Sequence, residues 1–342
     1  MRSTRHLVHP ELEPFVDTLP TYDLSNEALP EIRRGVQEAY KVQAPLAPDG
    51  VCVSESWIPG RGGQPDVRIL LYRPTSAVHP LPALLHVHGG GFVMGSAETM
   101  ELRHRHFVRE IGCIVVTVDY RLAPETPFPG PVEDCYTALL WLYRHAGQLG
   151  VDPARIAIGG ESAGGGIAAA LGLLTRDRGE VSIIFQWLIY PMLDDRTGHP
   201  ETPSPNTYAG EFLWTAANNQ FGWRSMLGPG TRAYGAECPV SPYVSPARAK
   251  DLAGLPATYL SVGAIDLFVD EIIDYGQRLI RAGVPTEMHI VPGAFHGFDL
   301  LPDTAIKARF QQSFCEALHR ALQPERSHHP CEGFADPSTG GR

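Results

Sequence analysis

The chain has 342 residues, which corresponds to one large domain or to one domain with a smaller cap. Hydrophobic residues make up 43% of it and charged residues 19%, an ordinary balance for a globular protein that buries a sizeable core. The formal net charge of −10 argues against a nucleic-acid partner, because contact with phosphates favours a basic surface.

The N-terminal arm, residues 1–45, contains two segments with helical character, 11–18 and 27–40. Pro14 and Pro30 fall early in these segments, where the first turn of a helix tolerates proline. Because both helices precede the first strand, we expect the arm to form part of a cap.

Residues 46–322 alternate between short apolar runs and amphipathic stretches, which predicts a mostly parallel sheet with helices on both faces. The predicted strands are 67–72, 83–88, 113–118, 155–158, 183–190, 257–262 and 287–291, and the predicted helices are 97–111, 131–148, 163–175, 271–282 and 304–322.

Residues 195–245 depart from this rhythm, since they are rich in proline, glycine, asparagine and aromatic residues. A long insertion between two strands of a sheet is often a lid, so we expect a cap insertion here. Its aromatic residues, together with the sequence after residue 91, predict an apolar substrate pocket that includes Phe92, Met94, Phe212 and Trp214. The tail, residues 323–342, is polar and contains glycine, proline and serine, so we expect it to be disordered.

The sequence Gly160-Glu161-Ser162-Ala163-Gly164 follows a predicted strand and precedes an alanine-rich helix. This is the strand–turn–helix setting in which Gly-x-Ser-x-Gly exposes a nucleophilic serine, because the flanking glycines leave room for a strained turn. The plainer interpretation, a glycine-rich helix start that only packs closely, does not account for this setting. We therefore predict Ser162 as the nucleophile.

A second glycine-rich loop, His88-Gly89-Gly90-Gly91-Phe92, directly follows the predicted strand 83–88. Its glycines let backbone N–H groups approach a substrate carbonyl, so Gly90 and Gly91 are candidates for one side of an oxyanion hole. The N–H of Ala163, at the start of a helix, is the candidate for the other side. A phosphate-binding loop is disfavoured, because no Lys-Ser/Thr pair follows the glycines.

A nucleophilic serine needs a base, and the base needs a group that orients it. Asp266 and His296 occur in the chain order serine, acid, histidine, and each follows a predicted strand, at the edge where parallel sheets place their sites. Other candidates lie within or at the start of regular elements, where capping or structural roles are expected: Asp270, Glu271, His289 and His319.

Two pairs of histidines, His86 with His88 and His104 with His106, suggest a metal site, but no third ligand stands at a recognisable spacing, so none is predicted. The six cysteines are scattered without a CxxC pair, as expected of free thiols in the cytoplasm. The N-terminus has no apolar signal region, and no apolar run reaches the length of a membrane span.

Taken together, the motifs resemble those of the bacterial hormone-sensitive-lipase-like branch of the α/β-hydrolases, over about residues 80–322. One residue departs from the pattern, since Glu161 stands where Asp or Thr is more frequent. The motifs, in chain order, are His88-Gly89-Gly90-Gly91-Phe92, Asp119 to Glu125 with Phe128-Pro129, Gly160-Glu161-Ser162-Ala163-Gly164-Gly165, Gly263 to Asp266, and His296-Gly297-Phe298.

The resemblance implies an α/β-hydrolase fold with a helical cap, and a serine carboxylesterase that needs no cofactor. It assigns the nucleophile, acid and base to Ser162, Asp266 and His296, and it also implies a homodimer through the last strand and helix. We expect a small-molecule ester substrate with a short- to medium-chain acyl group. Two alternatives stay open: an amidase such as an arylformamidase, which uses the same triad, and a non-catalytic ligand receptor of the same fold.

Overall fold

The computed structural model describes residues 3–40, 49–76, 80–202, 205–229 and 239–323. The predicted disordered tail therefore lies outside the described residues, apart from residue 323, as do parts of the N-terminal arm and of the predicted cap insertion. The strands are β1 (Val51–Ile58), β2 (Val67–Pro74), β3 (Leu81–Val87), β4 (Ile114–Asp119), β5 (Val151–Glu161), β6 (Phe185–Ile189), β7 (Ala257–Gly263) and β8 (Thr286–Val291).

The α-helices are α1 (Leu29–Tyr40), α2 (Glu101–His106), α3 (Gly130–Arg144), α4 (Ala146–Leu149), α5 (Ala163–Arg178), α6 (Ala216–Leu227), α7 (Val269–Arg281) and α8 (Ala305–Leu322). Shorter helical turns are η1 (Arg5–Leu7), η2 (Glu13–Thr18), η3 (Arg61–Gly63), η4 (Phe107–Ile111), η5 (Pro246–Arg248) and η6 (Phe298–Leu300).

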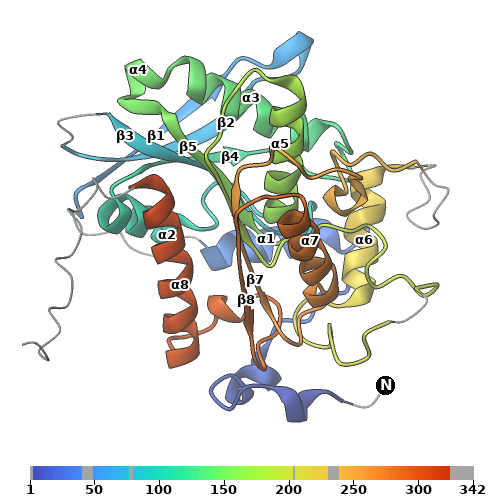
Figure 1. Cartoon of the computed structure of the whole chain (residues 1–342). Coiled ribbons are helices and arrows are strands. Elements are labelled where there is room, and N and C mark those ends of the chain that lie inside the picture. Colours follow the sequence, from blue (N-terminus) through green and yellow to red (C-terminus); the bar gives the residue numbers. More distant parts are fainter. Residues whose placement is uncertain (1–2, 41–48, 77–79, 203–204, 230–238, 324–342) are drawn as a thin grey trace, which may run out of the picture.

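All eight strands form one sheet in the order β1-β2-β4-β3-β5-β6-β7-β8. Strands β3 to β8 pair in parallel, whereas β2 pairs antiparallel with both β1 and β4. Helices α2 and α8 lie on one side of the sheet, and α3, α5 and α7 lie on the other (Figure 1). The predicted α/β fold with a mostly parallel sheet is therefore confirmed, and the carboxyl ends of β3, β5, β6, β7 and β8 meet along one edge.

Several elements differ from their predicted bounds. Strand β1 is not among the predicted strands, because the run Ser54-Glu55-Ser56 interrupts its apolar character. The structure shows that β1 is an edge strand, which pairs only with β2 and so is less buried than the inner strands. The predicted helix 97–111 begins later, at Glu101, since the N–H of Ser96 donates to the Thr99 hydroxyl in a turn, and it ends in the π-helical turn η4. The predicted helix 131–148 is divided at His145.

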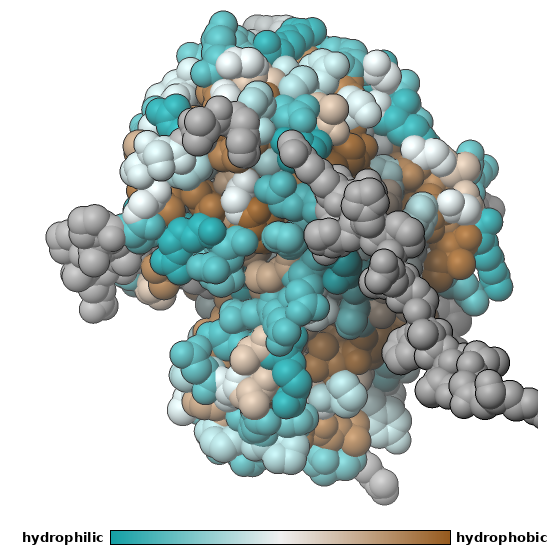
Figure 2. Space-filling view, turned by 60° about the vertical axis from the view of Figure 1, so that its left-hand side comes forward, coloured by the Kyte–Doolittle hydropathy of each residue, from teal (hydrophilic) through white to brown (hydrophobic). Residues whose placement is uncertain are grey.

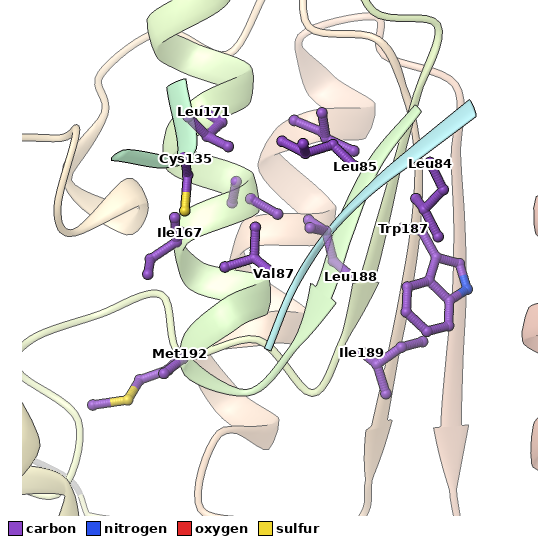
Figure 3. Packing of buried hydrophobic residues seen from close by; sticks show 14 of the residues in the cluster. Leu84, Leu85, Val87, Cys135, Ile167, Leu171, Trp187, Leu188, Ile189 and Met192 are labelled. Atoms are coloured by element: carbon purple, nitrogen blue, oxygen red, sulfur yellow. The ribbon is translucent and has the colours of Figure 1, made fainter. Parts of the chain in front are cut away.

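The core is one continuous cluster on both faces of the sheet. Strand β6 shows how alternate residues serve the two layers: Trp187 and Ile189 lie on one side of it and Leu188 on the other, toward α5 (Figure 3). On its side, Trp187 donates a hydrogen bond of 3.3 Å to the carbonyl of Phe314 in α8. The strands that carry the candidate site are thus fixed from both faces.

Two helices outside the alternating pattern reach the loop after β3. The guanidinium of Arg33, in α1, donates to the carbonyls of Val93 (2.6 Å) and Ala123 (2.9 Å). In α6, Gly222 comes so close that a Cβ on it would lie 2.7 Å from the carbonyl oxygen of Gly91. Both helices therefore pack against the glycine-rich loop that the sequence singled out.

The surface on the face seen in Figure 2 carries separate apolar patches among hydrophilic side chains. In the described part of the chain, none of the helices combines the length and the apolar character needed to cross a membrane.

Candidate active site

Ser162 occupies the sharp turn between β5 and α5. Its backbone has φ 56° and ψ −122°, a strained conformation that non-glycine residues rarely adopt outside functional sites. The turn is possible because its neighbours are glycines: a Cβ on Gly160 would lie 2.2 Å, and one on Gly164 2.0 Å, from the carbonyl oxygen of Val87 in β3. The Ser162 N–H donates to the carbonyl of Ile189 (2.9 Å), which ties the turn to β6.

The structure brings His296 and Asp266 together with Ser162. The Nε2 atom of His296 lies 3.0 Å from the Ser162 Oγ, and its Nδ1 atom lies 2.8 Å from Oδ2 of Asp266. The other oxygen of Asp266 accepts a hydrogen bond of 2.9 Å from the Phe268 N–H, so the carboxylate is held at both ends. With Nδ1–H donating to Asp266, Nε2 is free to accept the serine proton.

The other acid and base candidates have different partners. Asp270 accepts a hydrogen bond from the Asn206 side chain, and Glu271 accepts one from the Leu193 N–H. In β8, Nε2 of His289 lies 2.8 Å from Glu287. His319 belongs to the last turn of α8.

Aromatic rings enclose the His296 imidazole. The rings of Tyr190 and Phe268 lie edge-on to it, at 4.7 Å and 5.1 Å between centroids, and the ring of Trp214 is tilted to it at 6.3 Å. These rings limit the access of water to the base, which strengthens its hydrogen bonds. The sequence does not single out Tyr190, although it is the last residue of the predicted strand 183–190 and directly follows the observed strand β6, at the same edge of the sheet.

The glycine-rich loop after β3 has the backbone that only glycine adopts readily. Gly90 has φ 118° and Gly91 has φ 60°. Two side chains hold the backbone at the start of the loop. Nδ1 of His88 lies 2.8 Å from the Gly89 carbonyl oxygen, and the Tyr120 hydroxyl donates to the His88 carbonyl (3.0 Å). Burial lowers the pKa of the His88 imidazole, so this support is uncharged at neutral pH.

Ala163 is the first residue of α5, so its N–H is one of the unpaired donors at a helix N-terminus. Such donors favour negative charge beside the serine. The residues predicted for the oxyanion hole thus lie on two segments beside Ser162: Gly90 and Gly91 on the loop after β3, and Ala163 at the start of α5.

The side chains of the four predicted pocket residues are all buried, but they contact different parts of the structure. Trp214 reaches both halves of the site, because a Cβ on Gly91 would lie 2.2 Å from its ring and the ring also faces His296. Phe92 instead packs against Trp223 of α6, at 5.1 Å between centroids. Phe212 packs against Phe295 (5.6 Å), and the Met94 side chain is buried as well.

A groove of about 680 Å³ lies at the opposite end of the strands, with Cys52, Arg73 and Gln148 in its lining. Its lining includes none of the three triad residues, so we do not expect hydrolysis there.

The histidines considered for a metal have other partners. Nδ1 of His86 lies 3.0 Å from Nε2 of His104, and Nε2 of His86 lies 2.8 Å from Glu161. Across the described ranges, the side chains of His, Cys, Asp and Glu form no group of three that could hold a metal ion. Four of the six cysteines, Cys52, Cys113, Cys135 and Cys315, are free thiols, and the other two lie outside the described residues.

Comparison with known proteins adds a family and relatives. Residues 84–300 match the model of a family described by the alpha/beta hydrolase fold. Esterase LipI of Mycobacterium tuberculosis is 39% identical over 222 residues, which are 64% of this chain and 65% of LipI, just under two thirds of its length. Carboxylesterase NlhH of the same species is 31% identical over 299 residues, 85% of this chain and 88% of NlhH.

Among solved structures, a bacterial heroin esterase is 43% identical with a TM-score of 0.88, covering 94% of this chain and 100% of the esterase. Esterase LipW from Mycobacterium marinum is 35% identical with a TM-score of 0.80, covering 94% of this chain and 98% of LipW.

Proposed function

Since the chain belongs to the alpha/beta hydrolase family and is an ester hydrolase, we propose that it is a serine carboxylesterase for short- to medium-chain acyl esters. The observation that carries the proposal is the hydrogen-bonded series from Ser162 Oγ to His296 (3.0 Å) and from His296 to Asp266 (2.8 Å). A nucleophile, a base and an orienting carboxylate in contact are what acyl transfer requires.

In the proposed reaction Ser162 attacks the ester carbonyl while Nε2 of His296 takes its proton. Asp266 keeps the imidazole in the useful tautomer and stabilises the imidazolium that forms. The N–H groups of Gly90, Gly91 and Ala163 donate hydrogen bonds to the developing oxyanion, and each such donor is worth about 2.7–4 kcal/mol in the transition state. His296 then protonates the leaving alcohol, and water repeats the steps on the acyl-enzyme.

The expected preference for short acyl groups is supported by the Trp214 ring. This ring stands between the glycine-rich loop and His296, so it limits the space beside the nucleophile. A relative from Pseudomonas putida, 28% identical over 302 residues, is named ethyl acetate hydrolase. An acetyl ester is the smallest of the substrates that we propose for this chain.

The proposal is tested with p-nitrophenyl acetate, butyrate, octanoate and palmitate, each beside the matched p-nitroanilide. We expect turnover that is highest for acetate or butyrate and falls toward palmitate, with slow or no cleavage of the anilides. Anilides cleaved faster than matched esters would assign the chain to the amidase class instead. A parent protein that binds the esters without turning them over would favour the receptor alternative.

Two further expectations belong to this proposal. Strand β8 is the last strand of the sheet and pairs with β7, and its outer residue Ile290 is 42% exposed, which supports a homodimer through this edge. Light scattering on the purified protein tests that expectation. The free thiols of the four described cysteines support the cytoplasm as the proposed location.

A further inference from the structure

A series of buried charged side chains links the segment that carries Ser162 to the segment that carries His296. Glu161, the residue before Ser162, accepts a hydrogen bond of 2.6 Å from Nη1 of Arg103 in α2. The other arm of the same guanidinium donates to Asp299 (2.6 Å), which follows His296 by three residues. The side chains of Arg103 and Glu161 are 9% and 2% exposed, and that of Asp299 is fully buried.

The series ends on a ring that contacts the base. The hydroxyl of Tyr190 donates to the second oxygen of Asp299 (2.8 Å), and the Tyr190 ring meets the His296 imidazole edge-on, at 4.7 Å between centroids. The backbone of Tyr190 is fixed as well, because its N–H donates to the carbonyl of Ser261 (2.7 Å). The position of this ring therefore depends on Asp299, and through Asp299 on Arg103.

Such a bridge matters because the two segments have few other polar links. Within the described ranges, no backbone hydrogen bond joins residues 159–166 to residues 293–301. The 3.0 Å distance between Ser162 and His296 thus depends on side-chain packing, on Asp266 and on the Arg103 bridge. A misplacement of about 1 Å at such a contact costs on the order of 10²-fold in rate.

The Glu161 carboxylate of the bridge is charged at neutral pH. Burial alone would raise the pKa of Glu161, but the neighbouring His86 imidazole and Arg103 guanidinium hold that pKa at about 2. The second oxygen of Glu161 lies 2.8 Å from Nε2 of His86, so the carboxylate is bound on both sides. A guanidinium suits this place, because its planar fork can hold two carboxylates in a fixed geometry and a lysine ammonium cannot.

We propose that Arg103 is a positioning residue for the reaction: by bridging Glu161 and Asp299 it fixes Tyr190 against His296 and so holds the base at bonding distance from Ser162. This inference rests on the proposed function, because it needs His296 to be the base. Arg103 and Tyr190 are buried beside the catalytic residues, so their loss should lower kcat and leave KM nearly unchanged.

The first test compares Arg103→Lys with the matched control Arg105→Lys. Arg105 belongs to the same helix, is 15% exposed, and also holds two carboxylates, Glu101 (2.9 Å) and Asp49 (3.0 Å), but not ones beside Ser162 or His296. With p-nitrophenyl butyrate we expect Arg103→Lys to lower kcat about tenfold or more, with KM within about twofold. Arg105→Lys should keep kcat within about twofold of the parent.

The second test uses Tyr190→Phe, which keeps the ring and removes only its hydroxyl, so the fold should tolerate it. We expect kcat to fall about three- to tenfold, since the ring loses its anchor on Asp299. Both changes act through the same series of side chains. The fold-decrease in kcat of the double variant Arg103→Lys/Tyr190→Phe should therefore be smaller than the product of the fold-decreases of the two single variants. Melting temperatures measured for every variant separate lost positioning from lost folding.

The outcomes are separable with Ser162→Ala as a reference. An active parent that Ser162→Ala inactivates, together with a selective loss of kcat in Arg103→Lys and Tyr190→Phe, supports the positioning role. An active parent with kcat unchanged in Tyr190→Phe, or with losses that match the unfolded fraction, overturns that role alone. A parent that shows no esterase activity overturns both this role and the proposed function.

Discussion

Replacing Gly91 with alanine tests how closely the glycine-rich loop is fitted to the site. A Cβ on Gly91 would lie 2.2 Å from Cη2 and 2.8 Å from Cζ2 of the Trp214 ring. Carbon atoms in contact are normally about 3.5–4.0 Å apart, so the loop or the ring must move by roughly 1.3 Å or more. The backbone φ of 60° adds a cost of about 1–2 kcal/mol for a residue that has a Cβ.

We expect Gly91→Ala to lower kcat about 10²- to 10³-fold, the loss that removal of one oxyanion donor causes. The assay is turnover of p-nitrophenyl butyrate, with Gly147→Ala as the control, because a Cβ on Gly147 meets nothing within 4 Å. Adding Trp214→Ala to Gly91→Ala removes the clash and should restore part of the activity, about tenfold, while the backbone strain remains. Gly91→Ala with kcat within about threefold of the parent would refute the proposed oxyanion loop.

Three further predictions concern single side chains. Asp266→Asn should lower kcat about 10⁴-fold with little change in KM, because the imidazole loses its orienting charge; a loss below about tenfold would contradict the role of Asp266. Trp214→Ala should move the optimum of the p-nitrophenyl ester series toward longer chains, and an unchanged optimum would show that this ring does not size the pocket. Burial and the Asp194 charge raise the pKa of Glu271 well above its usual value, so the folded protein binds more protons than the unfolded chain and loses stability as the pH rises from about 4. The melting temperature of Glu271→Gln relative to that of the parent should therefore increase as the pH rises from about 4 to about 8. Melting temperatures of the two proteins that change with pH in parallel would contradict this.

The sequence predicts the parallel part of the sheet well, because β3, β4, β6 and β7 are buried over nearly their whole length and appear as short apolar runs. It does not predict β1, whose residues alternate between exposed and half-buried positions and include Ser54, Glu55 and Ser56. Nor does it predict that β2 runs antiparallel to β4, because strand direction depends on pairing between distant segments and leaves no trace in local composition.

For the candidate site, the sequence predicts residues that carry a local signature. Ser162 lies between glycines that a tight turn requires, and Asp266 and His296 follow predicted strands, so topology alone places them at one edge. The pocket residues are harder to predict, because an aromatic residue in an insertion can face either the substrate or the core. Trp214 lies beside His296, whereas Phe92 packs against α6.

The bridge that Arg103 forms between Glu161 and Asp299 cannot be predicted from the sequence alone. In the sequence, Glu161 stands out only as a departure from a family pattern, and Arg103 and Asp299 lie 58 and 138 residues away from it in the chain. A charged residue in a sequence is normally expected on the surface. Only the fold shows that these charges are buried and satisfy one another, because that depends on how α2 packs against the sheet.

Acylation of Ser162 is the central claim, and covalent labelling tests it most directly. The parent and Ser162→Ala are incubated with a fluorophosphonate, and the adduct is located by mass spectrometry of the digested protein, while esterase turnover is followed in parallel. We predict one adduct per chain, on the peptide that contains Ser162, and a loss of turnover of about 10³-fold or more in Ser162→Ala. An adduct on another residue, or a Ser162→Ala variant that turns over esters as fast as the parent, would contradict the claim.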